Sequence, residues 1–449
     1  MTPLVVKKKQ RSRTIPLFAL LTFIALILQT QPSMSATKAG AKCTKVGIKS
    51  VVGNKTFTCT KSGKKLVWNK GVTTKPIALP TKDVSNSLSI SDPKLFNPPG
   101  VCRINDLSFR VDTSNGFPRP NATLNGKSKA LVLVLPVSFT DQVFGDEDLT
   151  RIRNRLDEVE QFYKKMSYGK FELSFEIPAK ADWVTIEATA DSYNLVQLAP
   201  QQNNYILVEK IFQVSSQQLN FDKYDAVVIE TKPFYSTGGG QGFPSEEFKT
   251  NHGTAKRVTF ESGNGAGIAR VIAHELGHTL FGLEDLYVFL NSSRPSVPDP
   301  TPAGNWDFMS SIGGNIFGWS KYLNGWLEDT SISCATTQNS LTTYLSKLDA
   351  IDTHKKLFLI NISPGMVISA EVRLADNPLC INEGIYKPDM CLGLLIYTVN
   401  TNINHGEGPI VAQKSLLYLK ETLTLGKYQF IVDDFDDKGL LVTMNQIGN

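Results

Sequence analysis

Two histidines and one glutamate carry the clearest chemistry in this sequence. His274, Glu275 and His278 form the pattern H-E-x-x-H within VIAHELGHTLFGLEDLYVF, and a chance match is rare in a chain with five histidines. On a helix, positions i and i+4 lie one turn apart on the same face, so both imidazoles can reach one metal ion. Glu275 then lies beside them, where a carboxylate can accept a proton from a metal-activated water. The pattern predicts a zinc site with Glu275 as general base.

The third ligand is predicted to be a carboxylate that closely follows the helix. The other histidines are His252, His354 and His405. None of them closely follows the pattern, and only His252 is near enough upstream to be a remote candidate. No glutamate lies between Glu284 and Glu328, which disfavours a ligand on a second downstream helix. Two histidines and a nearby carboxylate suit zinc and leave one position open for water, so Glu284 and Asp285 are both candidates.

The helix that must position these residues is predicted over GNGAGIARVIAHELGHTLFG, with Gly282 at its end. Its buried face is expected to comprise Ile268, Val271, Ile272 and Leu276. Tyr287 and Tyr322 are candidates for stabilising an oxyanion. An extended substrate is expected to pair with an edge strand upstream of the helix, for which RVTFES (Arg257 to Ser262) is the candidate.

The surrounding elements predict an α+β fold. KALVLVLPVSF (Lys129 to Phe139) and YDAVVIET (Tyr224 to Thr231) have the pattern of buried strands, and DEDLTRIRNRLDEVEQFYKKMS has apolar residues at helical spacing. The glycine-rich STGGGQGF lacks the Gly-Lys-Ser/Thr of a phosphate-binding loop, so we expect a flexible loop there. Beyond Asp329 the runs are strand-like and closely spaced, which predicts a C-terminal β-sandwich or barrel-like domain.

The N-terminal segment predicts export. Residues 1–36 contain five basic residues, no acidic residue and the apolar run IPLFALLTFIALIL, with small residues near Ala36. This pattern is typical of a signal peptide, either cleaved or retained as an anchor, so we expect a secreted or cell-surface protein. Removing these five from the 47 basic residues leaves 42, which equals the number of acidic residues and argues against a nucleic-acid partner.

A small lysine-rich module is predicted after the signal. Residues 37–72 have short alternating runs and the pair Cys43 and Cys59, as expected of a β module held by a disulfide. Residues 37–76 contain ten lysines and no acidic residue, so an anionic cell-envelope polymer is a candidate partner and a solvated basic face is the alternative. Residues 73–125 are predicted to be a linker or pro-segment.

The remaining cysteines are Cys102, Cys334, Cys380 and Cys391. They allow three disulfide pairings, which the sequence leaves open. For Cys102, a disulfide is preferred over a thiolate that caps the metal, because exported chains oxidise their cysteines.

Several motifs in order resemble one family. HELGHTLFGLEDLY, GNWDFMSS and FGWSKYLNGWL, with ALVLVLPVSFTD and QFYKKMSYGKFELSF upstream, resemble the secreted bacterial metallopeptidases of the immune inhibitor A type, which are metzincin-like zinc peptidases. The resemblance covers about Lys129 to Leu327 and, more loosely, SAEVRL and GLLIYTVN. It implies a metzincin-like zinc peptidase core over residues 126–329, with a twisted mixed sheet and an active-site helix, and a β-rich domain over residues 330–449.

Carried over by position, the resemblance also implies roles for single residues. These are zinc ligands His274, His278 and Asp285, the catalytic base Glu275, and a methionine turn at Met309. The family usually has two residues between the second histidine and the glycine, whereas this chain has three, Thr279 to Phe281. Counting from the helix therefore points to Glu284, which stays open as the alternative third ligand.

The expected activity is that of a secreted zinc-dependent endopeptidase that acts on protein or peptide substrates. Zn²⁺ is the expected cofactor, with Ca²⁺ as a further candidate. The alternative is a cell-surface binding protein that keeps a structural or degenerate zinc site and has no peptidase activity. The sequence gives no prediction of the oligomeric state.

Overall fold

The computed structural model describes residues 38–448 except 44, 53–54, 74–88, 109–111, 125, 194–200, 216, 236–239, 264–266, 290–298, 312, 337–339 and 376–390. The predicted signal peptide, part of the predicted linker and Cys380 lie outside the described residues. The chain divides into two compact units, Met1–Thr81 and Lys82–Asn449. Helices and sheets occur together, which confirms the predicted α+β class.

The first unit is a small β module. Its strands are β1 (Lys49–Val52), β2 (Lys55–Ser62), β3 (Lys65–Trp68) and β4 (Val72–Thr73). β2 pairs antiparallel with each of the others, and a disulfide joins Cys43 to Cys59 of β2. Cys59 is fully buried, so the disulfide lies at the centre of a unit too small to form a large hydrophobic core. The predicted Cys43–Cys59 pairing and β module are confirmed.

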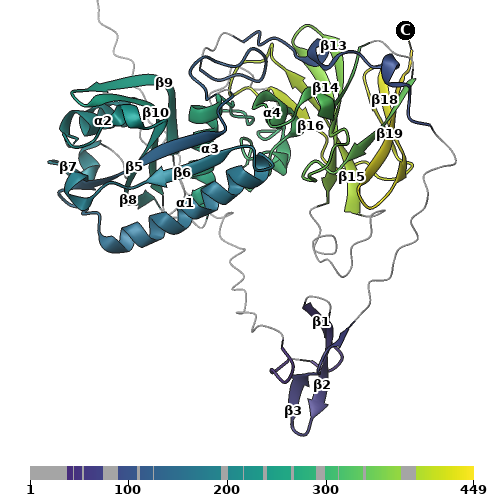
Figure 1. Cartoon of the computed structure of the whole chain (residues 1–449), viewed down its shortest axis with the longest axis horizontal. Coiled ribbons are helices and arrows are strands. Elements are labelled where there is room, and N and C mark those ends of the chain that lie inside the picture. The colour runs from purple at the N-terminus through teal and green to yellow at the C-terminus, as the bar shows by residue number, and fades with distance from the viewer. Residues whose placement is uncertain are drawn as a thin grey trace, which may run out of the picture. The chain divides into compact units, whose positions relative to one another are not determined.

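The second unit begins with a six-stranded sheet. Its strands are β5 (Lys129–Phe139), β6 (Glu172–Glu176), β7 (Val184–Ile186), β8 (Ala226–Tyr235), β9 (Gly240–Thr250) and β10 (Gly253–Gly263). The order is β6-β5-β8-β10-β9, and β7 also pairs with β5. β5 is parallel to its neighbours and β8 is parallel to β10, whereas β9 is antiparallel to β10. The sheet is therefore mixed, with an antiparallel strand at one edge (Figure 1).

Helices cover both faces of this sheet. They are α1 (Asp146–Met166), α2 (Gln201–Val214) and α3 (Ile268–Phe281), and a short α4 (Gly318–Leu323) follows later in the chain. Along β5, Val132 and Val134 pack in one core cluster with residues of α1 and α3, while Leu133 and Leu135 pack in another with residues of α2. Because successive side chains of a strand point to opposite faces, a strand covered on both faces is apolar without interruption.

Beyond residue 331 the chain forms two antiparallel-rich sheets. The first contains β11 (Ile332–Ala335), β13 (Leu357–Ser363), β14 (Met366–Leu374), β15 (Leu392–Asn400) and β16 (Ile410–Ala412), in that order. The second has the order β12 (Ser340–Ser346), β19 (Gly439–Gln446), β18 (Tyr428–Phe435) and β17 (Thr422–Leu425). Side chains from both sheets share one core cluster, so this region is a β-sandwich.

The sandwich and the helix-covered sheet belong to one compact unit. The rings of Phe317 and Tyr397 have centroids 4.3 Å apart, and the N–H of Gly318 donates to the carboxylate of Glu371 at 2.7 Å. The boundary predicted between residues 329 and 330 therefore lies inside the second unit.

Residues 89–108 and 112–124, which the sequence analysis assigned to a linker or pro-segment, pack against this unit. Ile104 and Leu124 are buried, and Cys102 forms a disulfide with Cys334 of β11. This packing excludes a free linker for these residues, whereas the alternative of a pro-segment stays a prediction. Their polar and proline-rich composition gave little sign of the few residues that are buried. The disulfide also excludes Cys102 as a thiolate cap on a metal. Cys391 is disulfide-bonded as well.

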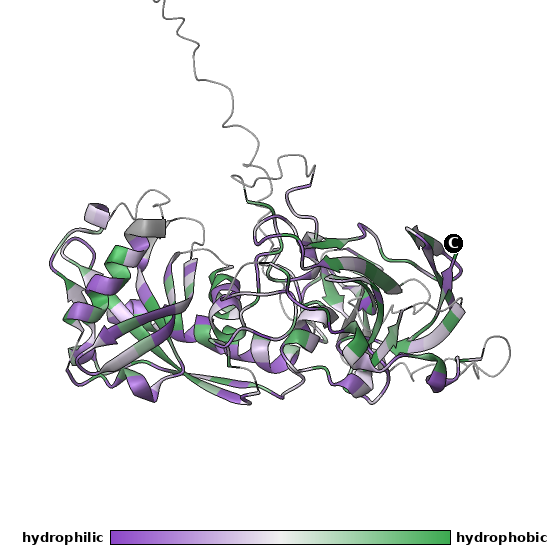
Figure 2. Cartoon of the chain, turned by 90° about the horizontal axis from the view of Figure 1, so that it is seen from above, coloured by the Kyte–Doolittle hydropathy of each residue, from purple (hydrophilic) through white to green (hydrophobic). Residues whose placement is uncertain are grey.

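Short 3-10 helices connect several of these elements. They span Pro93–Leu95, Pro99–Cys102, Lys180–Asp182, Ala190–Tyr193, Phe221–Lys223, Gly304–Trp306 and Asp329–Ser331. Figure 2 shows hydrophobic and hydrophilic residues interspersed along the helices and strands of the second unit. In the part of the chain that the structure describes, no helix is long and apolar enough to cross a membrane.

Candidate metal centre

The helix α3 carries the H-E-x-x-H residues and ends where the sequence predicts. Its buried face includes Ile268, Ile272 and Leu276. Gly282 ends the helix in the left-handed conformation, with a φ of 60°. A Cβ at Gly282 would lie 2.8 Å from Thr123 Cγ2, so both the backbone conformation and the available space require glycine. This ending turns the chain back toward the helix.

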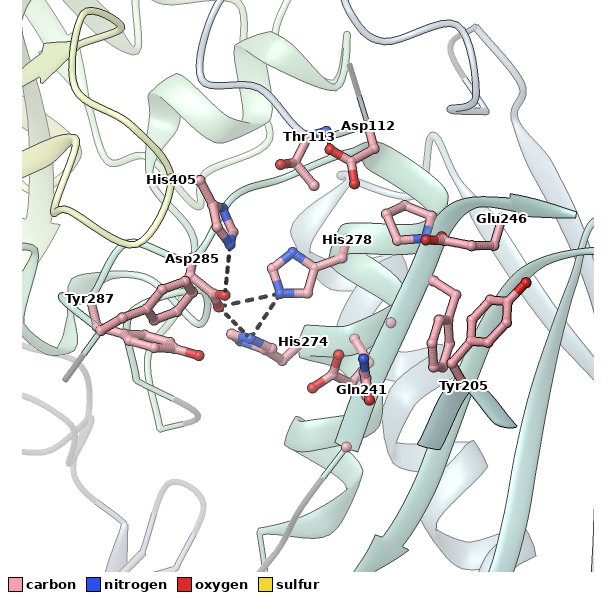
Figure 3. Close-up of a pocket in the computed structure, with 16 residues that line it drawn as sticks. Asp112, Thr113, Tyr205, Gln241, Glu246, His274, His278, Asp285, Tyr287 and His405 are labelled. Atoms are coloured by element: carbon pink, nitrogen blue, oxygen red, sulfur yellow. Dashed lines mark hydrogen bonds and ion pairs between the residues drawn. The ribbon is translucent and has the colours of Figure 1, made fainter. Parts of the chain in front are cut away.

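The two histidines of α3 and Asp285 converge on one point (Figure 3). Asp285 Oδ1 lies 3.0 Å from His274 Nε2 and 3.3 Å from His278 Nε2, and the two Nε2 atoms are 3.2 Å apart. All three residues are buried, with no more than 8% of any of them exposed. The three side chains form a group that could hold a metal ion.

Backbone carbonyls fix the orientation of both imidazole rings. His274 Nδ1 lies 3.0 Å from the carbonyl oxygen of Phe308, and His278 Nδ1 lies 2.6 Å from that of Leu283. A carbonyl oxygen only accepts hydrogen bonds, so each Nδ1 carries a proton and each Nε2 is the atom left to coordinate. Metal-binding histidines are usually held by such outer partners.

The electrostatics of the three groups favour positive charge on the histidines beside the Asp285 carboxylate. Burial lowers the pKa of His278, but the charge of Asp285 and its hydrogen bond outweigh burial and raise the pKa to about 9. Burial opposes the ionised form of Asp285, but the charge of His278 and hydrogen bonds from the neighbouring histidines hold its pKa well below the usual value. The site thus stabilises a buried negative carboxylate together with positive charge.

Glu284, the alternative third ligand, faces away from this group. Its Oε2 accepts a hydrogen bond of 2.6 Å from Asn115 Nδ2, and only 2% of the residue is exposed. Burial lowers the pKa of Arg119 to about 10, and the charge of Glu284 opposes this effect. Glu284 thus has a polar partner in the chain before β5 and is not part of the group that could hold a metal ion.

Glu275 lies beside the converging group and faces the edge strand β9. Its carboxylate accepts a hydrogen bond from the N–H of Gly242, and a Cβ built on Gly240 would lie only 2.7 Å from Glu275 Cγ. Burial raises the pKa of Glu275, and the two histidines oppose this rise. Glu275 lines the same cavity as the histidines, so its carboxylate can reach a molecule bound there.

Met309 packs directly against α3 at the turn between the two histidines. A Cβ on Gly277 would lie 2.7 Å from the Met309 sulfur, so glycine at this position lets the sulfur approach the helix. The carboxylate of Asp307 fixes the turn by accepting from the N–H groups of Met309 and Phe317 at 2.8 and 2.6 Å. The predicted methionine turn thus corresponds to a buried turn in contact with the helix.

The two tyrosines proposed from the sequence have different positions. Tyr287 lines the cavity and stacks on His274, with ring centroids 6.4 Å apart. Burial, reinforced by the charge of Asp285, raises the pKa of Tyr287. Tyr322 instead accepts from Arg103 Nε at 2.9 Å and donates to Asp329 at 2.7 Å, and it does not line the cavity. The suggestion that Tyr322 stabilises an oxyanion is therefore wrong.

The cavity that contains the group has a volume of about 550 Å³. One wall is the beginning of β9, from Gly240 to Pro244, and Tyr205 of α2 contributes to another. Among the strands that the structure describes, β9 pairs only with β10, so it is an edge strand of the kind to which an extended peptide can add. Two predictions are corrected here: Arg257 to Ser262 belong to the interior strand β10, and Gly240 to Phe243, expected in a flexible loop, begin the edge strand.

His405 is a residue of the site that the sequence analysis missed. It follows β15 in the sandwich, and its Nε2 lies 3.4 Å from Asp285 Oδ2. The remote candidate His252 is instead in the turn between β9 and β10, where its carbonyl accepts from the N–H of Phe221. The only local signal for His405 is the pair of glycines that follows it, in NHGEG.

Comparison of the sequence with protein-family models and with curated proteins found no match.

Proposed function

We propose that this chain is a zinc-dependent endopeptidase that acts outside the cytoplasm. The observation that carries the proposal is the convergence of His274 Nε2, His278 Nε2 and Asp285 Oδ1 within 3.3 Å of one another. Glu275 lies beside this group, in a cavity bordered by the edge strand β9. The site thus offers metal ligands, a general base and a surface for an extended chain.

Zinc fits this donor set. Two imidazole nitrogens and one carboxylate oxygen are typical of catalytic zinc sites, which keep a further position open. Backbone carbonyls on both Nδ1 atoms are the usual outer partners of zinc-binding histidines. When bound, zinc would polarise the scissile carbonyl and lower the pKa of a water molecule. Calcium, the further candidate, fits less well because it prefers a larger set of oxygen ligands.

The side chains around the ligands supply the rest of the reaction. Glu275 takes a proton from the attacking water and passes it to the leaving amine, and the N–H of Gly242 holds the Glu275 carboxylate in place. Tyr287 lines the same cavity and is the candidate donor to the oxyanion that forms at the scissile carbonyl.

An extended substrate would add a strand next to β9. The first residues of β9 line the cavity beside Glu275, and main-chain hydrogen bonds to a sheet edge bind peptides with little dependence on side chains. This position replaces the one expected from the sequence and brings the scissile bond close to the general base.

The arrangement also supports the metzincin-like core that the resemblance to immune inhibitor A type peptidases implies. A mixed sheet ends in an antiparallel edge strand beside α3, and a methionine-containing turn packs against the same helix at Gly277. These features are of the kind that the resemblance implies.

Zinc content and casein hydrolysis of the wild-type protein and the Glu275→Gln variant test the proposal. We expect both proteins to bind zinc and only the wild type to hydrolyse casein. Wild-type protein that binds zinc but cleaves neither casein nor a peptide library would overturn the peptidase proposal and would favour a binding protein with a structural metal.

The lysines of the first unit support the proposed attachment to an anionic cell-envelope polymer. Those described as exposed are Lys38, Lys42, Lys45, Lys61, Lys64, Lys65 and Lys70. Charge attraction of this kind weakens as salt screens it. Co-sedimentation of the full chain with a poly(glycerol phosphate) polymer should therefore fall as salt increases, and a variant with Lys61, Lys64 and Lys65 changed to Glu should bind less. Equal binding by this variant would refute the attachment.

A further inference from the structure

Asp285 divides its two carboxylate oxygens between separate partners. Oδ1 faces His274 and His278 at 3.0 and 3.3 Å. Oδ2 lies 3.4 Å from His405 Nε2 (Figure 3). The first two histidines come from α3, whereas His405 comes from the chain between β15 and β16 of the sandwich. His405, more than a hundred positions along the chain from Asp285, thus contacts the carboxylate of the group formed by His274, His278 and Asp285, here called the metal group.

The segment that contains His405 packs against the segment that follows Asp285 and forms backbone hydrogen bonds with it. The N–H of Phe289 donates to the carbonyl of Gly406 at 2.8 Å, and Val288 forms a β-bridge with Glu407. Gly406 has a φ of 70°, and a Cβ there would overlap the Phe289 ring. The backbone at this position therefore requires glycine, and the close approach that glycine allows sets the position of His405.

The surroundings of His405 leave its ring one polar contact. Only 13% of the side chain is exposed, and its ring lies edge-on to Phe289, with centroids 5.1 Å apart. Among the residues that the structure describes, none hydrogen-bonds to His405 Nδ1. The Nε2 of a neutral imidazole can carry a proton, and the carboxylate oxygen that it approaches at 3.4 Å can accept a hydrogen bond from it.

We propose that His405 is a positioning residue for Asp285, and that the sandwich is thereby a working part of the metal centre. A carboxylate bound through one oxygen can rotate about its Cβ–Cγ bond. A donor on the second oxygen stops this rotation and keeps Oδ1 directed at the two histidines. Such outer partners typically change metal affinity by about 10- to 100-fold. The inference rests on the proposed zinc site.

Zinc affinity, measured on the full chain by competition with a chelator, tests this role. We expect His405→Leu, which keeps bulk without a donor, to lower the affinity by about 10- to 100-fold. His405→Gln places an amide N–H near the position of Nε2 and should restore most of the affinity. His354→Leu is the matched control, because His354 lies in the same sandwich with a side chain that is 51% exposed, and it should bind zinc as the wild type does.

Cobalt in place of zinc separates positioning from direct coordination. The visible absorption of bound cobalt depends on the atoms that coordinate it, so it should be the same in the wild type and in His405→Leu at saturating metal. A changed spectrum would make His405 a ligand and overturn the positioning role, as would equal zinc affinity in the wild type and His405→Leu. Failure of the wild type to bind zinc would instead refute the proposed function. Unfolding curves of the metal-free proteins show whether each variant is folded.

Discussion

Asn115 donates a hydrogen bond of 2.6 Å to Glu284, and this contact directs Glu284 away from the histidines while the next residue, Asp285, faces them. Adjacent residues with the same chemistry thus have opposite surroundings. One carboxylate lies in a polar network made by the chain before β5, and the other lies at the centre of the metal group.

We predict that Asp285→Ala loses zinc and that Glu284→Gln keeps it. Removing a ligand should lower zinc affinity by more than the roughly 100-fold typical of an outer partner. Glu284→Gln should instead lower the free energy of unfolding by about 1–3 kcal/mol, because it disturbs a buried hydrogen-bonded group. Zinc content after dialysis and chemical unfolding measure the two effects. Loss of zinc in Glu284→Gln with retention in Asp285→Ala would reverse the assignment.

The residues of the site that lie close together in sequence were predictable. His274, Glu275 and His278 follow from helical spacing, and the choice between Glu284 and Asp285 was confined to neighbours. The hydrogen bond that distinguishes Glu284 from Asp285 comes from Asn115. Asn115 lies far from both residues along the chain, so no sequence pattern near them predicts this contact. His405 was missed for the same reason, because its position depends on how the β15–β16 connection docks on Phe289.

The fold was predictable where one physical pattern dominates. The apolar run of β5 and the helical spacing of α1 lead directly to elements of the structure. β9 was mistaken for a loop because glycines have low strand propensity. The glycines of β9 are instead explained by close packing, since a Cβ at Gly240 or Gly242 would lie within about 3 Å of Glu275 or Thr279. Sequence patterns do not show such a contact between distant elements.

Glu275→Gln is predicted to abolish hydrolysis without loss of metal. Glutamine has nearly the same shape and can still accept from Gly242, but it cannot take a proton from water. General-base catalysis typically contributes about 10²- to 10⁴-fold, so kcat should fall by at least that factor. Steady-state hydrolysis of a fluorogenic peptide library at saturating zinc measures the change. A variant that retains wild-type kcat would show that Glu275 is not the base.

Gly240→Ala is predicted to impair catalysis through the position of Glu275. The new Cβ would lie 2.7 Å from Glu275 Cγ and 2.9 Å from Glu261 Oε2. Backbone N–H groups of Ser262 and Gly263 hold the other oxygen of Glu261, so Glu275 is the group that must move. A displacement of about 1 Å can cost about 10²-fold in rate.

The measurements for Gly240→Ala are kcat and zinc affinity, with Gly100→Ala as the control. A Cβ at Gly100 meets nothing within 4 Å, so this variant should behave as the wild type. Unchanged kcat in Gly240→Ala would mean that β9 can shift without disturbing the base.

Glu230 is predicted to make stability depend on pH. Burial raises its pKa to about 7, against the charges of Arg155 and Arg151, from an ordinary value of 4.5. Between these two values the folded chain keeps the proton and the unfolded chain loses it, so the free energy of unfolding falls as pH rises from about 4.5 to about 7. The contribution is on the order of 3 kcal/mol. Above this range it does not change further.

Glu230→Gln should remove this part of the pH dependence, because glutamine does not ionise. Chemical unfolding at several pH values from about 4 to about 8 measures how the free energy of unfolding changes with pH. This range includes the ordinary pKa of Glu230, 4.5, and its raised pKa of about 7. Glu187→Gln, at an exposed position, should keep the wild-type slope. If the free energy of unfolding depends on pH in the same way in the wild type and in Glu230→Gln, Glu230 is not the group responsible for the pH dependence.

The Cys102–Cys334 disulfide is predicted to hold the segment before β5 on the second unit. The two cysteines are 232 positions apart, and closing so long a loop restricts the unfolded chain strongly, by about 5 kcal/mol in the chain-entropy model. A variant with both cysteines changed to Ala should therefore unfold at lower denaturant concentration. Because this segment also supplies Asn115 and Arg119, limited proteolysis should cut it sooner. If the variant keeps wild-type stability and resists the protease, hydrogen bonds alone suffice to hold Glu284 away from the metal group.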